Sequence, residues 1–308
     1  MQSALDPAGP AASAIGLLGW VMLAAGALIF VAVVALTAWA IYAPERSRLW
    51  LASQAFVIWG GIVFPIVTLS ALLLYGLALA GDLVRAPGEA PLRIAVTGER
   101  WWWRVHYLDD GGGAAVVSAN EVRIPTGRPV EFILSSPNVI HSFWVPNLGG
   151  KLDMIPGRDT RFVLAAEREG IYRGQCAEYC GEQHALMAFP VVAVEPDIFA
   201  TWLAAQSEPA TLPATEIEAR GQELFLAFGC GACHTIAGTE AAGSIGPDLT
   251  HIGGRLTLAA GTLPNNPRNM EKWIAASQAI KPDNLMPSYS MLEGDELTAL
   301  AAYLGSLN

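Results

Sequence analysis

Two long apolar stretches without charged residues open the chain. The first covers the 38 positions between Asp6 and Glu45, and the second covers the 33 positions between Arg48 and Asp82. Each is longer than the roughly 20 residues that cross a bilayer as a helix. The pattern therefore predicts an N-terminal tail over residues 1–13 and a transmembrane helical hairpin over residues 14–81.

The spans are expected within Ala14–Tyr42 and Ala52–Ala80, with a kink at Pro65 in the second span. The short connection between them carries Arg46 and Arg48, whereas the tail contains no Lys or Arg. The positive-inside rule then places the connection in the cytoplasm and both ends of the hairpin outside. A signal peptide is the alternative for the first span, but no basic segment precedes it.

After residue 91 the pattern changes to short runs separated by Gly, Pro, Asn and Asp. Such runs predict a small sandwich or barrel over residues 82–205. The expected strands are Leu92–Thr97, Trp101–Leu108, Glu121–Ile124, Val130–Ser135, Arg161–Ala166, Ile171–Gly174 and Ala188–Val194.

A third region follows a Pro-, Ser-, Thr- and Ala-rich linker at residues 206–215, after a short helix that is expected to end at Trp202. Thr215 and Glu218 form a capping-box pattern that predicts a helix to about Phe228. Residues 216–308 are therefore expected to form a separate, all-α domain.

Composition supports this division. The chain has 308 residues, of which 53% are hydrophobic and only 15% charged, against about a quarter in soluble domains. These values exclude a fully soluble enzyme and a disordered chain. The net charge of −10 argues against nucleic acid as a partner and favours a basic protein partner.

Sulfur and nitrogen ligands cluster in the string CAEYCGEQHALM. Cys176, Cys180, His184 and Met187 follow one another at spacings of four, four and three residues, and His141 lies upstream after a predicted strand. Such ligands select copper or zinc over calcium or magnesium, and two thiolates can bridge two coppers. Three alternatives stand beside copper: a disulfide, a structural zinc site and ordinary packed side chains.

The strings GERWWW, HSFWVPNLGGKLDMIPGR and GIYRGQCAEYCGEQHALM closely resemble subunit II of haem–copper cytochrome c oxidases, and with the hairpin the resemblance covers roughly two thirds of the chain. It implies a cupredoxin-like Greek-key β-barrel that holds a dinuclear copper A centre. The implied ligands are the side chains of His141, Cys176, Cys180, His184 and Met187 and the backbone carbonyl of Glu178.

Two further roles follow from the resemblance alone. Trp101 matches the first Trp of the family's aromatic cluster, which implies an exposed ring through which the donor's electron reaches the copper. The alternative for residues 101–103 is packing of alternate rings on the barrel, with the others at the lipid headgroups. The Glu178 carboxylate is implied to face a magnesium site shared with subunit I.

The third region contains a C-x-x-C-H motif formed by Cys230, Cys233 and His234, the signature of a covalently attached c-type haem. A zinc or redox Cys pair is the alternative. The string GPDL, with Pro247, follows the motif as in small cytochromes c, in which that carbonyl orients the iron-binding His. All four cysteines are then assigned, two to copper and two to haem.

The sixth iron ligand is expected to be Met, which raises the haem potential. The candidates are Met270, Met286 and Met291, and the string KPDNLMPSY resembles the axial-Met loop of cytochromes c, so Met286 is predicted. His251 is expected to lie at the surface or to contact a haem propionate rather than to bind iron.

These features predict the electron-accepting subunit of a bacterial cytochrome c oxidase, a proton-translocating enzyme whose oxygen-reducing site lies in another subunit. The expected partners are subunit I, subunit III, the lipid bilayer and a soluble cytochrome c or another donor. Both redox domains are expected outside the bacterial inner membrane. The alternatives are a subunit of a copper-containing nitric oxide reductase and, from a different class, a membrane-anchored copper chaperone or redox sensor. The retained copper ligands disfavour a quinol oxidase subunit.

Overall fold

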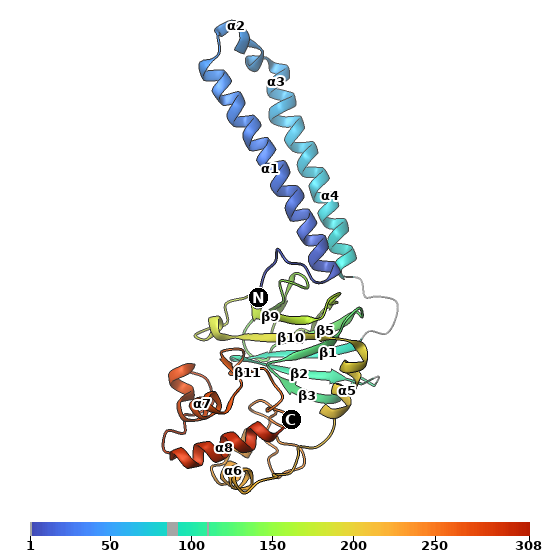
Figure 1. The fold of residues 1–308 in the computed structure, drawn as a ribbon. Coiled ribbons are helices and arrows are strands. Elements are labelled where there is room, and N and C mark those ends of the chain that lie inside the picture. Colours follow the sequence, from blue (N-terminus) through green and yellow to red (C-terminus); the bar gives the residue numbers. More distant parts are fainter. Residues whose placement is uncertain (1, 85–91, 110) are drawn as a thin grey trace. The chain divides into compact units, whose positions relative to one another are not determined.

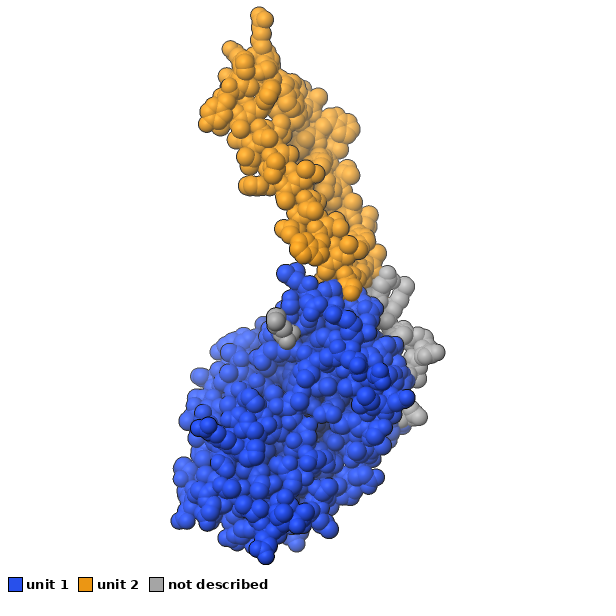
Figure 2. Space-filling model, in the orientation of Figure 1, with its two compact units in different colours: residues 1–12, 86–308 blue, residues 13–85 orange. Residues whose placement is uncertain are grey.

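The computed structural model describes residues 2–84, 92–109 and 111–308 of the chain. The chain divides into two compact units, residues 13–85 and residues 1–12 together with 86–308 (Figure 2). The smaller unit is a helical hairpin, and the larger holds a β-domain and a helical C-terminal domain (Figure 1).

The hairpin consists of two helical segments, each long and apolar enough to cross a membrane. The first is α1 (Pro10–Tyr42), with a mean hydropathy of 2.6, and the second is Gln54–Gly81, with a mean hydropathy of 2.3. None of the residues in the most apolar stretch of either segment is buried, as expected of surfaces covered by lipid. The two predicted spans are thus present.

The second segment is built from three consecutive pieces: α3 (Gln54–Ile58), the π-helical turn η2 (Trp59–Val63) and α4 (Phe64–Val84). The wide turn ends just before Pro65. Proline has no backbone N–H, and in an α-helix its ring would clash with the carbonyl four residues earlier. The predicted disturbance at Pro65 therefore takes the form of a π-helical turn. The short helices α2 (Glu45–Arg48) and η1 (Leu49–Ala52) connect the two segments.

The β-domain is formed by two five-stranded sheets, with the strand orders β3–β2–β1–β5–β8 and β4–β10–β9–β6–β7. The predicted small β-structure is confirmed, and it has the cupredoxin-like fold. The strands are β1 (Leu92–Glu99), β2 (Trp102–Leu108), β3 (Ala114–Ala119), β4 (Val122–Pro125), β5 (Val130–Ser135), β6 (His141–Trp144), β7 (Lys151–Met154), β8 (Thr160–Leu164), β9 (Gly170–Cys176) and β10 (Ala188–Val194).

Three of these strands, β3, β6 and β7, were not predicted. β3 is rich in Ala, which has low strand propensity, and β6 and β7 have only four residues each, too few to show an alternating pattern.

Alternation along the strands builds the core between the sheets. In β2, Trp103, Val105 and Tyr107 are buried, while the residues between them are half-buried. The Trp103 ring packs against Phe189 with centroids 4.9 Å apart, and Phe189 stacks on Phe143 at 4.6 Å. This aromatic layer supports the end of the domain at which β6 begins and β9 ends.

The N-terminal segment packs on the β-domain. The Ala8 N–H donates to Asn147 O at 2.7 Å, and the Glu167 N–H donates to Ala8 O at 2.8 Å. An ion pair of 2.9 Å joins Arg168 to Asp6. Residues before the first span thus contribute contacts to the larger unit.

The C-terminal domain is helical. Its elements are α6 (Glu216–Ala227), η4 (Cys230–Ala232), β11 (Thr257–Leu258), β12 (Leu263–Pro264), α7 (Pro267–Ile280) and α8 (Gly294–Ser306). The helix before it, α5 (Pro196–Gln206), extends beyond Trp202, so the end predicted at that residue is wrong.

The first and last helices of this domain pack closely. The Thr215–Glu218 capping box is present at the start of α6, as predicted. A Cβ at Gly221 would lie 2.1 Å from Ala299 O, so only glycine permits this approach of α6 to α8. The Phe225 and Tyr303 rings then meet with centroids 6.2 Å apart.

Candidate metal centre and haem cleft

The predicted copper ligands converge at one end of the β-domain. His141 begins β6 and Cys176 ends β9, while the loop after β9 carries Cys180, His184 and Met187. The Cys176 Sγ lies 3.7 Å from His141 Nδ1 and 3.7 Å from Cys180 Sγ. The Cys180 Sγ in turn lies 3.6 Å from His184 Nδ1 and 3.9 Å from Met187 Sδ. The structure thus brings all five predicted side chains together.

The two sulfur atoms are too far apart for a disulfide, in which they lie about 2.05 Å apart. Both cysteines are free and buried. Because a metal–thiolate bond measures about 2.3 Å, one ion can contact both sulfurs at their separation of 3.7 Å. The arrangement fits a metal ion that is bound by both Cys176 and Cys180, and it disfavours the disulfide alternative.

Electrostatics at Cys176 also favour a cation. Hydrogen bonding with Cys180 lowers the pKa of Cys176 below its ordinary range; burial opposes this shift, and hydrogen bonding with His141 adds to the lowering. The Glu178 carbonyl oxygen lies 3.2 Å from the same sulfur. A thiolate and a carbonyl oxygen repel each other unless a proton or a cation lies between them. A metal ion satisfies both groups.

The Glu178 side chain has a partner within the chain. Its carboxylate lies 3.5 Å from the Lys151 ammonium, and both side chains are nearly half exposed. The predicted magnesium role of this carboxylate stays a prediction.

The C-x-x-C-H motif opens the second site. Cys230 lies in η4, and Cys233 and His234 follow it at the rim of a mainly apolar cleft. The His234 Nδ1–H donates to Pro247 O at 2.7 Å, as the resemblance implied. This bond leaves Nε2 for an iron ion, and burial lowers the pKa of His234, which favours the neutral imidazole that ligates metals. The residues fit a covalently bound haem.

Two of the three candidate methionines line this cleft, Met270 and Met286. Met270 is only 3% exposed on α7, where it packs in the core of the domain. Met286 is half-buried on a loop. Its backbone carbonyl accepts hydrogen bonds from Ser277 Oγ at 2.9 Å and Gln278 Nε2 at 2.7 Å, and these bonds fix the loop. Met291 is 69% exposed. The geometry favours Met286.

His251 does not lie at the surface, so that part of the expectation is wrong, while a propionate contact stays a prediction. Its ring is buried, with Nδ1 3.0 Å from Asn308 O and Nε2 3.1 Å from Glu208 O. Among the described residues it is not part of the cleft lining. Each ring nitrogen lies within hydrogen-bonding distance of a backbone carbonyl oxygen. These contacts hold the buried ring away from the cleft.

Trp101 lies between the two sites. It lines the haem cleft, and its indole N–H donates to the carbonyl oxygen of Cys180 at 2.8 Å. The ring is only 7% exposed, so the expected exposed ring is wrong. It is enclosed because Gly181 lies against it and the helical domain contributes most of the cleft wall.

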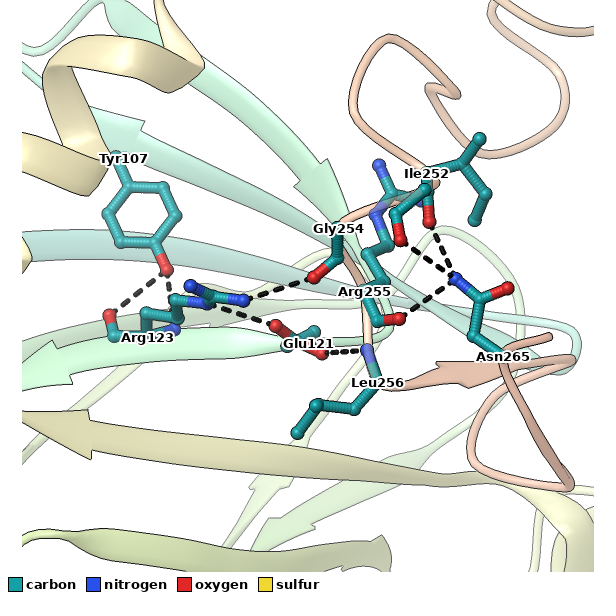
Figure 3. A network of polar contacts seen from close by, with 9 residues as sticks. Tyr107, Glu121, Arg123, Ile252, Gly254, Arg255, Leu256 and Asn265 are labelled. Carbon is teal, nitrogen blue, oxygen red and sulfur yellow. Dashed lines mark hydrogen bonds and ion pairs between the residues drawn. The ribbon is translucent and has the colours of Figure 1, made fainter. Parts of the chain in front are cut away.

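A polar network joins the β-domain to the helical domain (Figure 3). The Arg123 side chain pairs with Glu121 at 3.1 Å and donates to Gly254 O at 3.1 Å. The other Glu121 oxygen accepts from the Leu256 N–H at 2.8 Å, and the Tyr107 hydroxyl donates to Arg123 O at 3.0 Å. Sequence reasoning missed these contacts, which no local pattern signals.

Lys281 is a second residue that the sequence analysis missed. It follows α7 and is 2% exposed, yet its ammonium donates to the carbonyl oxygens of Trp101 at 2.6 Å, Leu186 at 2.9 Å and Ala259 at 3.3 Å. Burial lowers the pKa of Lys281 to about 7. The chain has only three lysines. No pattern in the sequence indicated that this one would be buried.

Comparisons with known proteins identify the two domains that carry these sites. Residues 105–194 match the family model described as cytochrome c oxidase subunit II, periplasmic domain, and residues 218–308 match that described as cytochrome c. The chain is 39% identical over 220 residues to cytochrome c oxidase subunit 2 of Alkalihalophilus pseudofirmus, covering 71% of this chain and 62% of that protein.

It is also 31% identical over 260 residues to the Bacillus subtilis protein of the same name, covering 80% of this chain and 72% of the relative. A solved structure of the periplasmic domain of subunit II of cytochrome oxidase from Bradyrhizobium japonicum matches 40% of this chain and 96% of its own, with 31% identity and a TM-score of 0.37.

Proposed function

The chain belongs to the cytochrome c oxidase subunit 2 family, and from that premise we propose that it receives electrons on a covalent haem c and passes them through a dinuclear copper centre toward subunit I, where oxygen is reduced to water. The chain spans less than two thirds of the first relative, at 62%, so the activity and partners of the whole enzyme are part of this proposal. When bound, haem iron and copper would each supply reversible one-electron chemistry.

The residues of the β-domain are suited to hold the copper pair. In this proposal the side chains of Cys176, Cys180, His141 and His184 would hold the two ions as strong donors, and Met187 would supply the weak thioether. Burial of the two sulfurs excludes water and oxidants from them. The Glu178 carbonyl adds an oxygen donor, and its carboxylate is assigned to the magnesium site shared with subunit I.

The helical domain is suited to hold the haem. Cys230 and Cys233 would attach the porphyrin, His234 would bind iron with its ring oriented by Pro247 O, and Met286 would supply a second iron ligand. A Met ligand favours the reduced iron and thereby raises the potential. This choice suits a haem that accepts electrons from an external donor.

The observation that carries the proposal is the position of Trp101. One indole ring lines the haem cleft and hydrogen-bonds to the carbonyl of Cys180, a predicted copper ligand. Electron transfer depends on short, well-packed connections, and this ring supplies one. We assign Trp101 as the residue through which electrons reach the copper from the chain's own haem.

The chain's two spans place it among membrane proteins, and its family carries a periplasmic domain. We propose that it lies in a bacterial inner membrane with the N-terminus and both redox domains outside. Subunit III, the bilayer and a donor that is basic, such as a soluble cytochrome c, are the further partners proposed. The net charge of −10 supports attraction of a basic donor.

The test is metal and haem analysis of the purified membrane complex that contains the full chain. We expect two copper atoms and one covalent haem per chain, with oxygen consumed when the donor is supplied. Zinc in place of copper would refute the copper assignment. Consumption of nitric oxide instead of oxygen would identify the enzyme as a nitric oxide reductase, and rapid loss of copper to a chelator would favour a chaperone.

A further inference from the structure

The segment that carries Met187 is held on both sides by the helical domain. Directly after it, the Ala188 N–H donates to Ala260 O at 3.0 Å. Directly before it, Leu186 O accepts from Lys281 Nζ at 2.9 Å and lies 3.4 Å from Thr262 Oγ1. Residues of one domain therefore fix the backbone around a predicted copper ligand of the other.

The Lys281 ammonium is satisfied only in this arrangement. It has three N–H donors, and its three acceptors are the carbonyls of Trp101, Leu186 and Ala259. Two of these acceptors belong to the β-domain and one to the helical domain. A buried charge that lost two of its three partners would be strongly disfavoured, so Lys281 resists separation of these backbones.

The loop Ala259–Thr262 is shaped for the same contact. Gly261 has a φ of +76°, which favours glycine, and a Cβ there would lie 3.1 Å from Ala188 Cβ and 3.2 Å from Ala188 C. The loop thus lies so close to the copper segment that a Cβ at this position would require Ala188 to shift by a few tenths of an ångström. Any bulkier residue would push against Ala188.

We propose that the helical domain, through Lys281 and the Ala259–Thr262 loop, positions the Met187 thioether and so tunes the copper centre. Lys281 is a positioning residue that acts through the backbone of Leu186. The thioether is a weak ligand, and the distance and orientation of such a ligand adjust the potential of a copper site. This inference rests on the proposed copper function.

The consequence is a coupling between the two redox domains. A copper centre with the helical domain docked would differ in spectrum and potential from one in which Lys281 is removed, even when the same five side chains are present. A role restricted to holding the domains together predicts no such difference in the spectrum of the copper.

The first experiment compares Lys281→Met with Lys272→Met in the intact complex. Lys272 is exposed on α7, the helix that Lys281 follows, and serves as the matched control. We expect both variants to retain copper and haem, and only Lys281→Met to shift the near-infrared and electron paramagnetic resonance spectra of copper. The equilibrium of electron sharing with haem should change about threefold to tenfold, where tenfold corresponds to about 59 mV.

A second variant and a metal-free measurement guard against misfolding of Lys281→Met. Gly261→Ala perturbs the same segment from the other loop and should shift the copper spectrum in its own right. In haem-loaded, copper-free protein the free thiols are those of Cys176 and Cys180, which lie 4% and 3% exposed. Lys281→Met should accelerate their alkylation several-fold, whereas Lys272→Met should not.

The outcomes are separable. If the native protein binds no copper, the proposed function fails. If copper is bound normally and both Lys281→Met and Gly261→Ala leave its spectrum, its potential and the thiol alkylation rate unchanged, the positioning role is wrong. Slower electron transfer with an unaltered copper spectrum also overturns it, because Lys281 would then only hold the domains together.

Discussion

Substitution of Glu121 by Gln tests whether the two redox domains are held together as the structure shows. Glu121 is 5% exposed on the β-domain, and its two oxygens have different partners: Arg123 at 3.1 Å and the Leu256 N–H of the helical domain at 2.8 Å. Gln keeps the shape but offers a single acceptor oxygen, and either orientation weakens the interface. The Leu256 bond is lost, or it remains with a neutral acceptor while an amide NH2 group faces the Arg123 guanidinium.

The expected loss follows from the exposure of the partners. A hydrogen bond to a charged group contributes about 1.5–3 kcal/mol. The Arg123 side chain is 23% exposed, so water compensates part of its loss and the middle of the range applies. We expect Glu121→Gln to weaken the contact by about 2 kcal/mol, or about 30-fold in the equilibrium between open and closed interfaces.

Amide hydrogen exchange of the full chain in detergent measures this equilibrium. The Leu256 amide donates across the interface, so its exchange should accelerate about 30-fold in Glu121→Gln. Glu223→Gln is the control, because the Arg220–Glu223 pair is exposed and contributes little. Unchanged exchange at Leu256 in Glu121→Gln would refute the interface.

Three further predictions concern single residues. Met286→Ala should leave the haem attached but lower its reduction potential, measured by redox titration, whereas Met291→Ala at an exposed position should not; equal potentials in Met286→Ala and the native protein would reject Met286 as a ligand. Gly221→Ala should destabilise the helical domain by about 2 kcal/mol, because the new Cβ overlaps Ala299 O, and calorimetry should show a lower melting temperature, while Gly305→Ala in open space on α8 serves as the control and should show none. Burial lowers the pKa of His106 below its ordinary 6.5, so on acidification the unfolded chain takes up the proton first and the stability of the folded protein decreases below about pH 6.5. His106→Gln should therefore reduce the fall in melting temperature between about pH 7.5 and 5.5. An identical fall in the variant and the native protein would contradict this.

The sequence predicted which candidate ligands lie close together better than it predicted their surroundings. The spacing of Cys176, Cys180, His184 and Met187 places them within one loop after a strand, so local geometry alone gathers them. The choice of Met286 depended on a resemblance, and it is favoured over Met270 because Met270 packs in the domain core. In both cases the informative residues are close together in the chain.

Contacts between the two domains could not be predicted from residues that are close together in the chain. Lys281 meets Leu186 across 95 positions, and Glu121 meets Leu256 across 135. Neither residue belongs to a periodic pattern or a motif, and each is buried and bonded to a residue of the other domain. Trp101 shows the same effect, since a ring expected at the surface is enclosed by a domain more than a hundred residues away in the sequence.

The most direct test of the central claim follows one electron through the isolated complex in a rapid-mixing experiment. With oxygen absent and the haem reduced first, absorbance of haem and of copper are recorded together. The account predicts that the haem is reoxidised as copper is reduced, at a rate independent of protein concentration, because both sites belong to one chain. A rate that rises with protein concentration, or copper that never changes its oxidation state, would contradict it.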